Sequence, residues 1–112
     1  MKNPVKACLL VAMLTGASAT SMASERMEDG REAYQAACAK CHEEGVDGAP
    51  KTGELEDWSN RSHLWEAVLF EHANQGYLNM PAKGGTAELP AYDVDAAAEY
   101  MLGISHPDMP LD

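Results

Sequence analysis

Cys38-Ala39-Lys40-Cys41-His42 is the segment around which the rest of this 112-residue chain is expected to fold. It has the form C-x-x-C-H, a pattern typical of covalent haem attachment. The two thiols can each add to one vinyl group at the edge of a haem, and the adjacent imidazole can bind the iron as an axial ligand. We therefore predict a single, covalently bound haem c, with Cys38 and Cys41 as thioether donors and His42 as an iron ligand.

The same cysteine pair has other interpretations. A zinc site would need a second pair of ligands, and the only other cysteine, Cys8, lies in a segment that we expect to be removed. A redox-active dithiol would be expected near a βαβ pattern, but the sequence shows no strand-like alternation of apolar and polar residues. A chance match is the remaining alternative, and haem attachment is the interpretation that we favour.

The N-terminal segment has the layout of a secretory signal peptide. Lys2 and Lys6 precede a short apolar run and small residues follow it. Ala17-Ser18-Ala19 and Ser21-Met22-Ala23 both fit a small-x-small cleavage site, and we prefer a cut after Ala23. The predicted organisation is a signal peptide over residues 1–23 and one monohaem domain over residues 24–112.

Export fits the cofactor, because bacteria attach c-type haem outside the cytoplasm, and we expect the protein in the periplasm. The apolar run is shorter than the roughly 20 residues of a spanning helix, so we expect no stable membrane insertion after cleavage. Without the predicted signal peptide the chain has few large aromatic side chains, among them a single phenylalanine. A bound cofactor would supply apolar mass to this thin core.

The formal net charge is −10, and removal of residues 1–23 would change it to −12 because two lysines and no acid would be lost. Such acidity argues against nucleic acid as a partner, since phosphates would repel the protein. It permits an electrostatically steered encounter with a redox protein that has a basic docking patch. Solubility or a saline habitat is the alternative explanation of the acidity.

Three amphipathic segments predict an all-α domain. The first helix is expected to begin at Asp29, which with Glu32 resembles a capping box, and to run to His42. The second is expected over about Ser62–Asn74 and is ended by Gly76, and the third is expected over about Pro90–Leu102 and is ended by Gly103 and Pro107. Residues 43–57 are rich in glycine, proline and acids and predict a loop after His42.

A second axial ligand would make the iron an electron carrier instead of an open site. Met80 is the leading candidate, because it lies in a loop rich in proline and glycine that could pass over the opposite haem face. Met101 and His72 fall on apolar helix stripes, where a structural role is the simpler interpretation. The other candidates are Met27, Met109, His63 and His106.

These motifs together resemble the bacterial class I c-type cytochromes, nearest to the cytochrome c5 family. The resemblance rests on residues 38–42, on Gly45-Val46-Asp47-Gly48-Ala49-Pro50-Lys51, on Trp58 with Arg61, and on Met80-Pro81-Ala82-Lys83-Gly84-Gly85. It extends from Gly30 to Leu102. It implies a small all-α fold in which three main helices and their loops wrap one haem.

The resemblance also implies roles for individual residues. Pro50 matches the residue whose carbonyl holds the proximal imidazole, and Met80 matches the distal iron ligand. Trp58 and Arg61 match the region beside the haem propionates. The first and last helices are expected to cross at Gly30, with Tyr34 and Tyr100 as an aromatic pair beside the crossing.

The function that follows is a one-electron shuttle that cycles between ferric and ferrous iron, with no catalytic residues and no enzymatic activity. A haem enzyme or gas sensor with a displaceable sixth ligand is one alternative. A haem subunit of a larger dehydrogenase is another. We expect a monomer and leave a dimer open.

Overall fold

The computed structural model of the chain describes residues 19–59 and 66–106. In these two ranges the regular structure is entirely helical apart from one isolated bridge between Tyr77 and Met80, which confirms the predicted all-α class. No helix among the described residues is long and apolar enough to cross a membrane. Most of the predicted signal peptide and Arg61 lie outside the described residues.

The first helical run is longer than predicted. Helix α1 spans Ala19–Ala33 and continues without a break through a π-helical turn, η1 (Tyr34–Cys38), into the short helix α2 (Ala39–His42). The capping box predicted at Asp29 was therefore wrong, because the helix begins ten residues earlier. The preceding residues contain neither glycine nor proline and include several good helix formers, so nothing in them stops the helix.

The segment after His42 is less irregular than predicted. It contains a 3₁₀ turn, η2 (Val46–Gly48), and a short helix, α3 (Leu55–Ser59). The middle helix α4 is described over Glu66–Gln75, and Gly76 ends it as predicted. Gly76 has a φ of +87°, and its N–H donates to the His72 carbonyl at 2.8 Å.

A second 3₁₀ turn, η3 (Ala82–Gly85), precedes the last helix α5, which spans Ala91–Ser105. The prediction that Gly103 ends this helix was wrong. Ser105 is 2% exposed and its Oγ accepts a hydrogen bond from the Gly53 N–H at 3.0 Å. Packing of the last turn against the loop at Gly53 therefore outweighs the low helix propensity of glycine.

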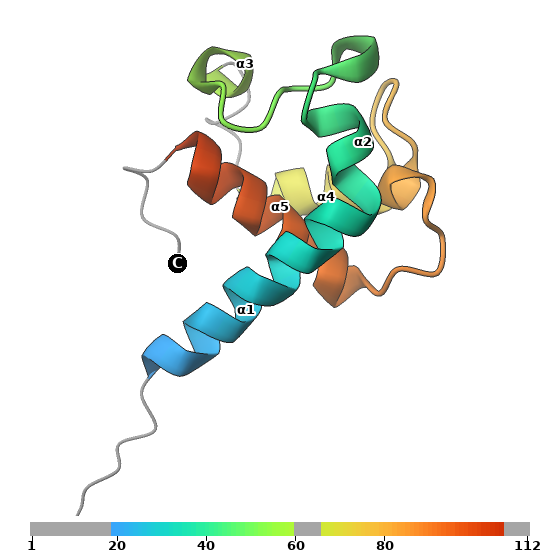
Figure 1. Cartoon of the computed structure of the whole chain (residues 1–112). Helices are drawn as coiled ribbons and strands as arrows, with labels where there is room; N and C mark the ends of the chain where they lie inside the picture. The colour runs from blue at the N-terminus through green and yellow to red at the C-terminus, as the bar shows by residue number, and fades with distance from the viewer. Residues whose placement is uncertain (1–18, 60–65, 107–112) are drawn as a thin grey trace, which may run out of the picture.

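Helices α1 and α5 cross in the middle of the molecule (Figure 1). A Cβ placed on Gly30 would lie 2.2 Å from the Ala96 carbonyl oxygen, so only glycine permits this approach. Beside the crossing the rings of Tyr34 and Tyr100 pack with centroids 5.3 Å apart. Arg26 forms an ion pair with Glu99 and so ties an earlier turn of α1 to α5 as well.

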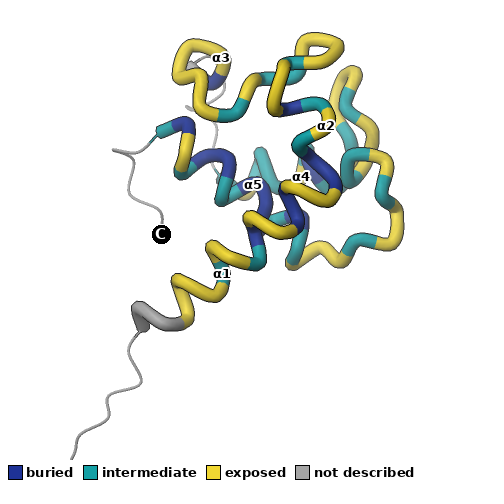
Figure 2. The backbone as a smooth tube through the Cα atoms, in the orientation of Figure 1, coloured by how far each residue is buried: buried dark blue, intermediate teal, exposed yellow. Residues whose placement is uncertain are grey.

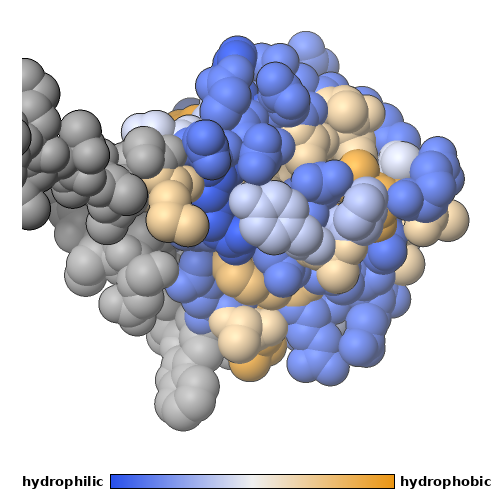
Figure 3. Space-filling model, turned by 90° about the horizontal axis from the view of Figure 1, so that it is seen from below, coloured by the Kyte–Doolittle hydropathy of each residue, from blue (hydrophilic) through white to orange (hydrophobic). Residues whose placement is uncertain are grey.

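Many of the core residues come from the two helical segments that cross here. In Figure 2 the buried segments gather where α5 meets the end of the first helical run, while residues 22–28 of α1 are mostly exposed and the loops are exposed or partly buried. On the face shown in Figure 3, hydrophilic side chains cover most of the surface and apolar ones form small groups. The buried apolar side chains are Ala33, Tyr34, Ala37, Cys38, Trp58, Ala73, Val94, Ala96, Ala97, Ala98, Met101 and Leu102.

Candidate functional site

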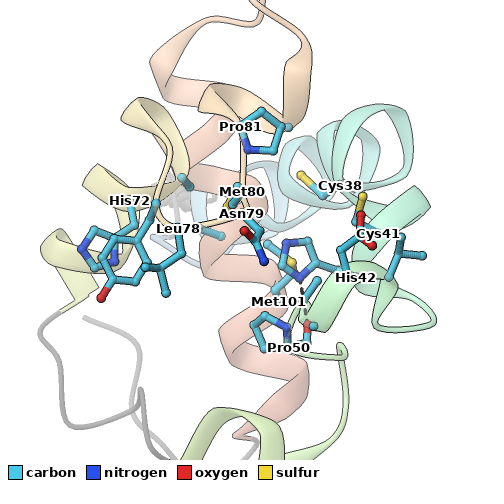
Figure 4. Close-up of a pocket in the computed structure, with 18 of the residues that line it drawn as sticks. Cys38, Cys41, His42, Pro50, His72, Leu78, Asn79, Met80, Pro81 and Met101 are labelled. Carbon is cyan, nitrogen blue, oxygen red and sulfur yellow. Dashed lines mark hydrogen bonds between the residues drawn. The ribbon is translucent and has the colours of Figure 1, made fainter.

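A cavity of about 520 Å³ opens between the end of the first helical run, the loop that follows it, the Met80 loop and helices α4 and α5 (Figure 4). Its volume falls within the roughly 300–1,000 Å³ of cofactor pockets. Small side chains make room for it, because Ala37, Ala73 and Ala98 stand on its walls where larger apolar residues would fill the space. The helix periodicity places these alanines on the inner faces but gives no sign that their smallness shapes a pocket.

Two free thiols, those of Cys38 and Cys41, line one side of this cavity. Cys38 closes the π-helical turn, in which the Ala39 N–H bonds to the Tyr34 carbonyl. Such turns are frequent at functional sites. Burial raises the pKa of the Cys38 thiol to about 11, so this group is uncharged at neutral pH in the structure described here.

The His42 ring is buried, and a hydrogen bond at its Nδ1 fixes its orientation. Its Nδ1 lies 2.8 Å from the Pro50 carbonyl oxygen. Because a carbonyl only accepts hydrogen bonds, Nδ1 carries the proton and Nε2 is left with the lone pair that can bind a metal. The backbone holds the same loop in place, since the Thr52 N–H donates to the His42 carbonyl at 2.8 Å.

Trp58 supports this proximal loop instead of pointing a free donor into the cavity. Its side chain is 5% exposed and lines the cavity. The centroid of its ring lies 6.3 Å from the centroid of the His42 ring. Its indole N–H donates to the Lys51 carbonyl at 2.9 Å. The indole N–H is therefore already paired with a backbone carbonyl. Arg61, the other residue expected near the propionates, lies outside the described residues.

Met80 ends a tight turn and, like His42, lines the cavity (Figure 4). Tyr77 and Met80 exchange two backbone hydrogen bonds of 3.0 and 2.9 Å, which close the turn. Leu78, inside the turn, has a φ of +53°. The turn thus presents the Met80 side chain to the cavity with little backbone freedom.

Some of the other candidate axial ligands line the cavity and some do not. Met101 and His72 also line the cavity, Met101 from α5 and His72 from α4. The His72 ring stacks on that of Tyr77 at 3.8 Å, a contact that the sequence did not predict. Met27 and His106 are described but are not among the lining residues, while His63 and Met109 lie outside the described residues.

This arrangement fits a haem. One apolar cavity contains two free thiols, an imidazole whose Nε2 is available, and the thioether side chains of Met80 and Met101. Haem proteins of the cytochrome c type need these donor types together.

Comparison with known proteins finds similar chains. The family model described as cytochrome C oxidase, cbb3-type, subunit III matches residues 25–101. The chain is 40% identical over 80 residues to cytochrome c-555 of Chlorobaculum tepidum, covering 68% of this chain and 74% of that protein. It is 38% identical over 78 residues to cytochrome c-551 of Halorhodospira halochloris, covering 66% of this chain and 95% of that protein.

A solved structure is similar in fold as well. A chain in the crystal structure of an electron transfer complex of nitrite reductase with cytochrome c aligns with a TM-score of 0.64 and 32% sequence identity. The alignment covers 69% of this chain and 94% of the other.

Proposed function

Because this chain belongs to the class I c-type cytochromes of bacteria, whose members transfer electrons on a haem, we propose that it is a periplasmic one-electron carrier with His42 and Met80 as axial ligands. Cys38 and Cys41 would hold the single haem through thioether bonds. The observation that carries this proposal is the shared cavity, which brings the two thiols, the oriented imidazole and the Met80 side chain together. The narrower likeness to cytochrome c5 stays a prediction.

Each residue has a distinct task in this proposal. The haem supplies a one-electron couple when it is bound. Pro50 accepts the Nδ1 proton of His42 in a hydrogen bond, which makes the imidazole a more basic ligand and favours the ferric state. The soft thioether of Met80 favours the ferrous state, so the two ligands act on the potential in opposite directions.

The cavity walls and the two thiols would protect and retain the haem. Leu69, Ala73 and Ala98 give the cavity an apolar lining that limits access of water to the metal. Covalent attachment through Cys38 and Cys41 prevents loss of the cofactor during repeated encounters. If His42 and Met80 both hold the iron, no coordination position would be left for a substrate, which favours a carrier over a haem enzyme or gas sensor.

Optical spectra of the oxidised and reduced protein, with and without carbon monoxide, test the proposal. We expect a haem spectrum, a weak far-red sulfur-to-iron band in the oxidised form, and no ready binding of carbon monoxide. Met80→Ala should abolish the far-red band and lower the potential. Met101→Leu, which removes the other thioether of the cavity, should retain the band. The reverse pattern would transfer the ligand role to Met101, and ready carbon monoxide binding by the unaltered protein would contradict the proposal.

The proposed partner is a redox protein with a basic docking patch. The acidity of the chain, with a formal charge of −10, supports this choice because it would attract a basic surface. The similar chain in the complex of nitrite reductase with cytochrome c supports a redox enzyme as one kind of partner. Whether this cytochrome acts free or docked in a larger dehydrogenase depends on such a partner.

A further inference from the structure

We propose that Lys83 is a positioning residue for the thioether of Met80, acting through a hydrogen bond from its side chain to the Leu89 carbonyl. The inference rests on the proposed function, in which Met80 binds the iron. It assigns a role to the part of the Met80-Pro81-Ala82-Lys83-Gly84-Gly85 motif that the ligand assignment leaves unexplained.

The backbone at Lys83 is unusual for a lysine. Its φ is +54°, a left-handed conformation that L side chains rarely adopt, and Gly84 and Gly85 follow with φ of +62° and +86°. Glycine would take this conformation more easily than lysine. The lysine side chain does make an interaction that a glycine could not supply.

That interaction is a hydrogen bond of 2.7 Å from Lys83 Nζ to the Leu89 carbonyl oxygen, in a partly buried position. A donor that carries a charge makes a stronger bond than a neutral one. Leu89 is itself packed against the hydrophobic core cluster. The Lys83 side chain thus fastens the Met80 loop to a fixed point of the core.

The other side of the loop rests on the helix that carries the thiols. A Cβ on Gly84 would lie 2.7 Å from the Ala37 carbonyl oxygen, so the backbone of η3 lies directly on η1 (Figure 1). Two further backbone bonds, from Gly84 to Pro81 and from Thr86 to Lys83, hold the turn itself. The Lys83 bond fastens this turn through a side chain, so a substitution can remove it and leave the backbone bonds in place.

Binding of imidazole to the oxidised protein measures how readily Met80 leaves the iron. Lys83→Met removes the ammonium and keeps most of the side-chain length, and we expect it to bind imidazole about 10- to 100-fold more tightly. Lys83→Gly, which also relaxes the backbone, should show the same direction of change and serves if the methionine variant folds poorly. Lys83→Arg keeps a cationic donor and should restore most of the original affinity. Faster amide exchange at Thr86 in Lys83→Met would report the same loosening without use of the iron.

Two controls separate this role from general effects. Arg31→Met changes the net charge equally at an exposed position of α1, and Ser105→Ala removes a neutral side-chain hydrogen bond to the loop at Gly53. Neither should change the imidazole affinity. The inference is overturned if Lys83→Met binds imidazole like the unaltered protein while Met80→Ala still abolishes the far-red band. If Met80→Ala leaves that band intact, the ligand assignment itself has failed and the role of Lys83 falls with it.

Discussion

Gly30→Ala tests whether the domain depends on the close crossing of α1 and α5. The new Cβ would lie 2.2 Å from the Ala96 carbonyl oxygen and 2.8 Å from its carbon, against an ordinary contact distance of at least 3.4 Å. The obstructing atoms belong to the backbone, so no side-chain rotation can relieve the overlap and the helices must separate by about 1 Å. Overpacking of this kind costs about 1–3 kcal/mol and occasionally more.

The substitution also brings a gain, because alanine is favoured over glycine in a helix by about 1 kcal/mol. A clash with two backbone atoms belongs at or above the upper end of the overpacking range, so we expect a net loss of about 2 kcal/mol in the free energy of unfolding. For a domain of this size that corresponds to a fall of roughly 8–16 °C in Tm. Chemical and thermal unfolding of the haem-loaded protein, followed by far-UV circular dichroism, would measure both quantities.

The control is Glu32→Ala, on an exposed position of the same helix, which should change the free energy of unfolding by no more than about 0.5 kcal/mol. A Gly30→Ala protein that is more stable than the unaltered one by about 1 kcal/mol would show only the gain in helix propensity. That result would refute the close crossing.

Three further predictions concern pH, the proximal loop and partner binding. Burial and the hydrogen bond to Glu43 raise the pKa of Tyr34 to about 12, so its contribution to stability is complete below pH 10 and is lost as the pH rises toward 12. We expect a loss of about 1–2 kcal/mol, moderated because Glu43 is exposed, and Tyr34→Phe should remove this slope from alkaline unfolding curves. Trp58→Phe should cost about 1 kcal/mol of stability and raise the reduction potential, because loss of the bond to Lys51 loosens the loop that makes the His42 imidazole basic; an unchanged potential in voltammetry would contradict this. Electron transfer to a basic partner should slow as salt rises from about 0.01 to 0.1 M, where the screening length falls from about 30 to 10 Å, and stopped-flow rates indifferent to salt would exclude steering.

The residues of the C-x-x-C-H motif and Met80 could be chosen from the sequence because the chemistry of a haem demands particular donor types in a particular order. The helix ends were harder to predict. Glycine often ends a helix, yet α5 continues past Gly103 because the buried Ser105 hydroxyl accepts a hydrogen bond from the distant Gly53 N–H. A contact between residues so far apart in sequence leaves no local pattern that could reveal it.

Trp58 shows the same limit within the site. Its place near the haem was expected from the resemblance, but the acceptor of its N–H was not, because a backbone carbonyl is present at every residue and no side-chain pattern distinguishes that of Lys51. Likewise, the lysine at position 83 is visible in the sequence, while its left-handed backbone and its bond to Leu89 appear only in three dimensions. The sequence therefore predicted the Pro50 carbonyl that orients His42, through the resemblance, but not the backbone acceptors that Trp58 and Lys83 use.

The two proposed ligands are held by different means. His42 is oriented by a backbone carbonyl, and its loop is closed by a further backbone bond from Thr52. Met80 is presented by its turn, which the Lys83 side chain fastens to Leu89 at the core. The Lys83 bond has a charged donor and contributes about 1.5–3 kcal/mol, so loss of this one bond is enough to loosen the turn. We therefore expect the Met80 side of the site to open first when the domain is perturbed. Any exchange of ligands under stress should therefore replace Met80 and leave His42 in place.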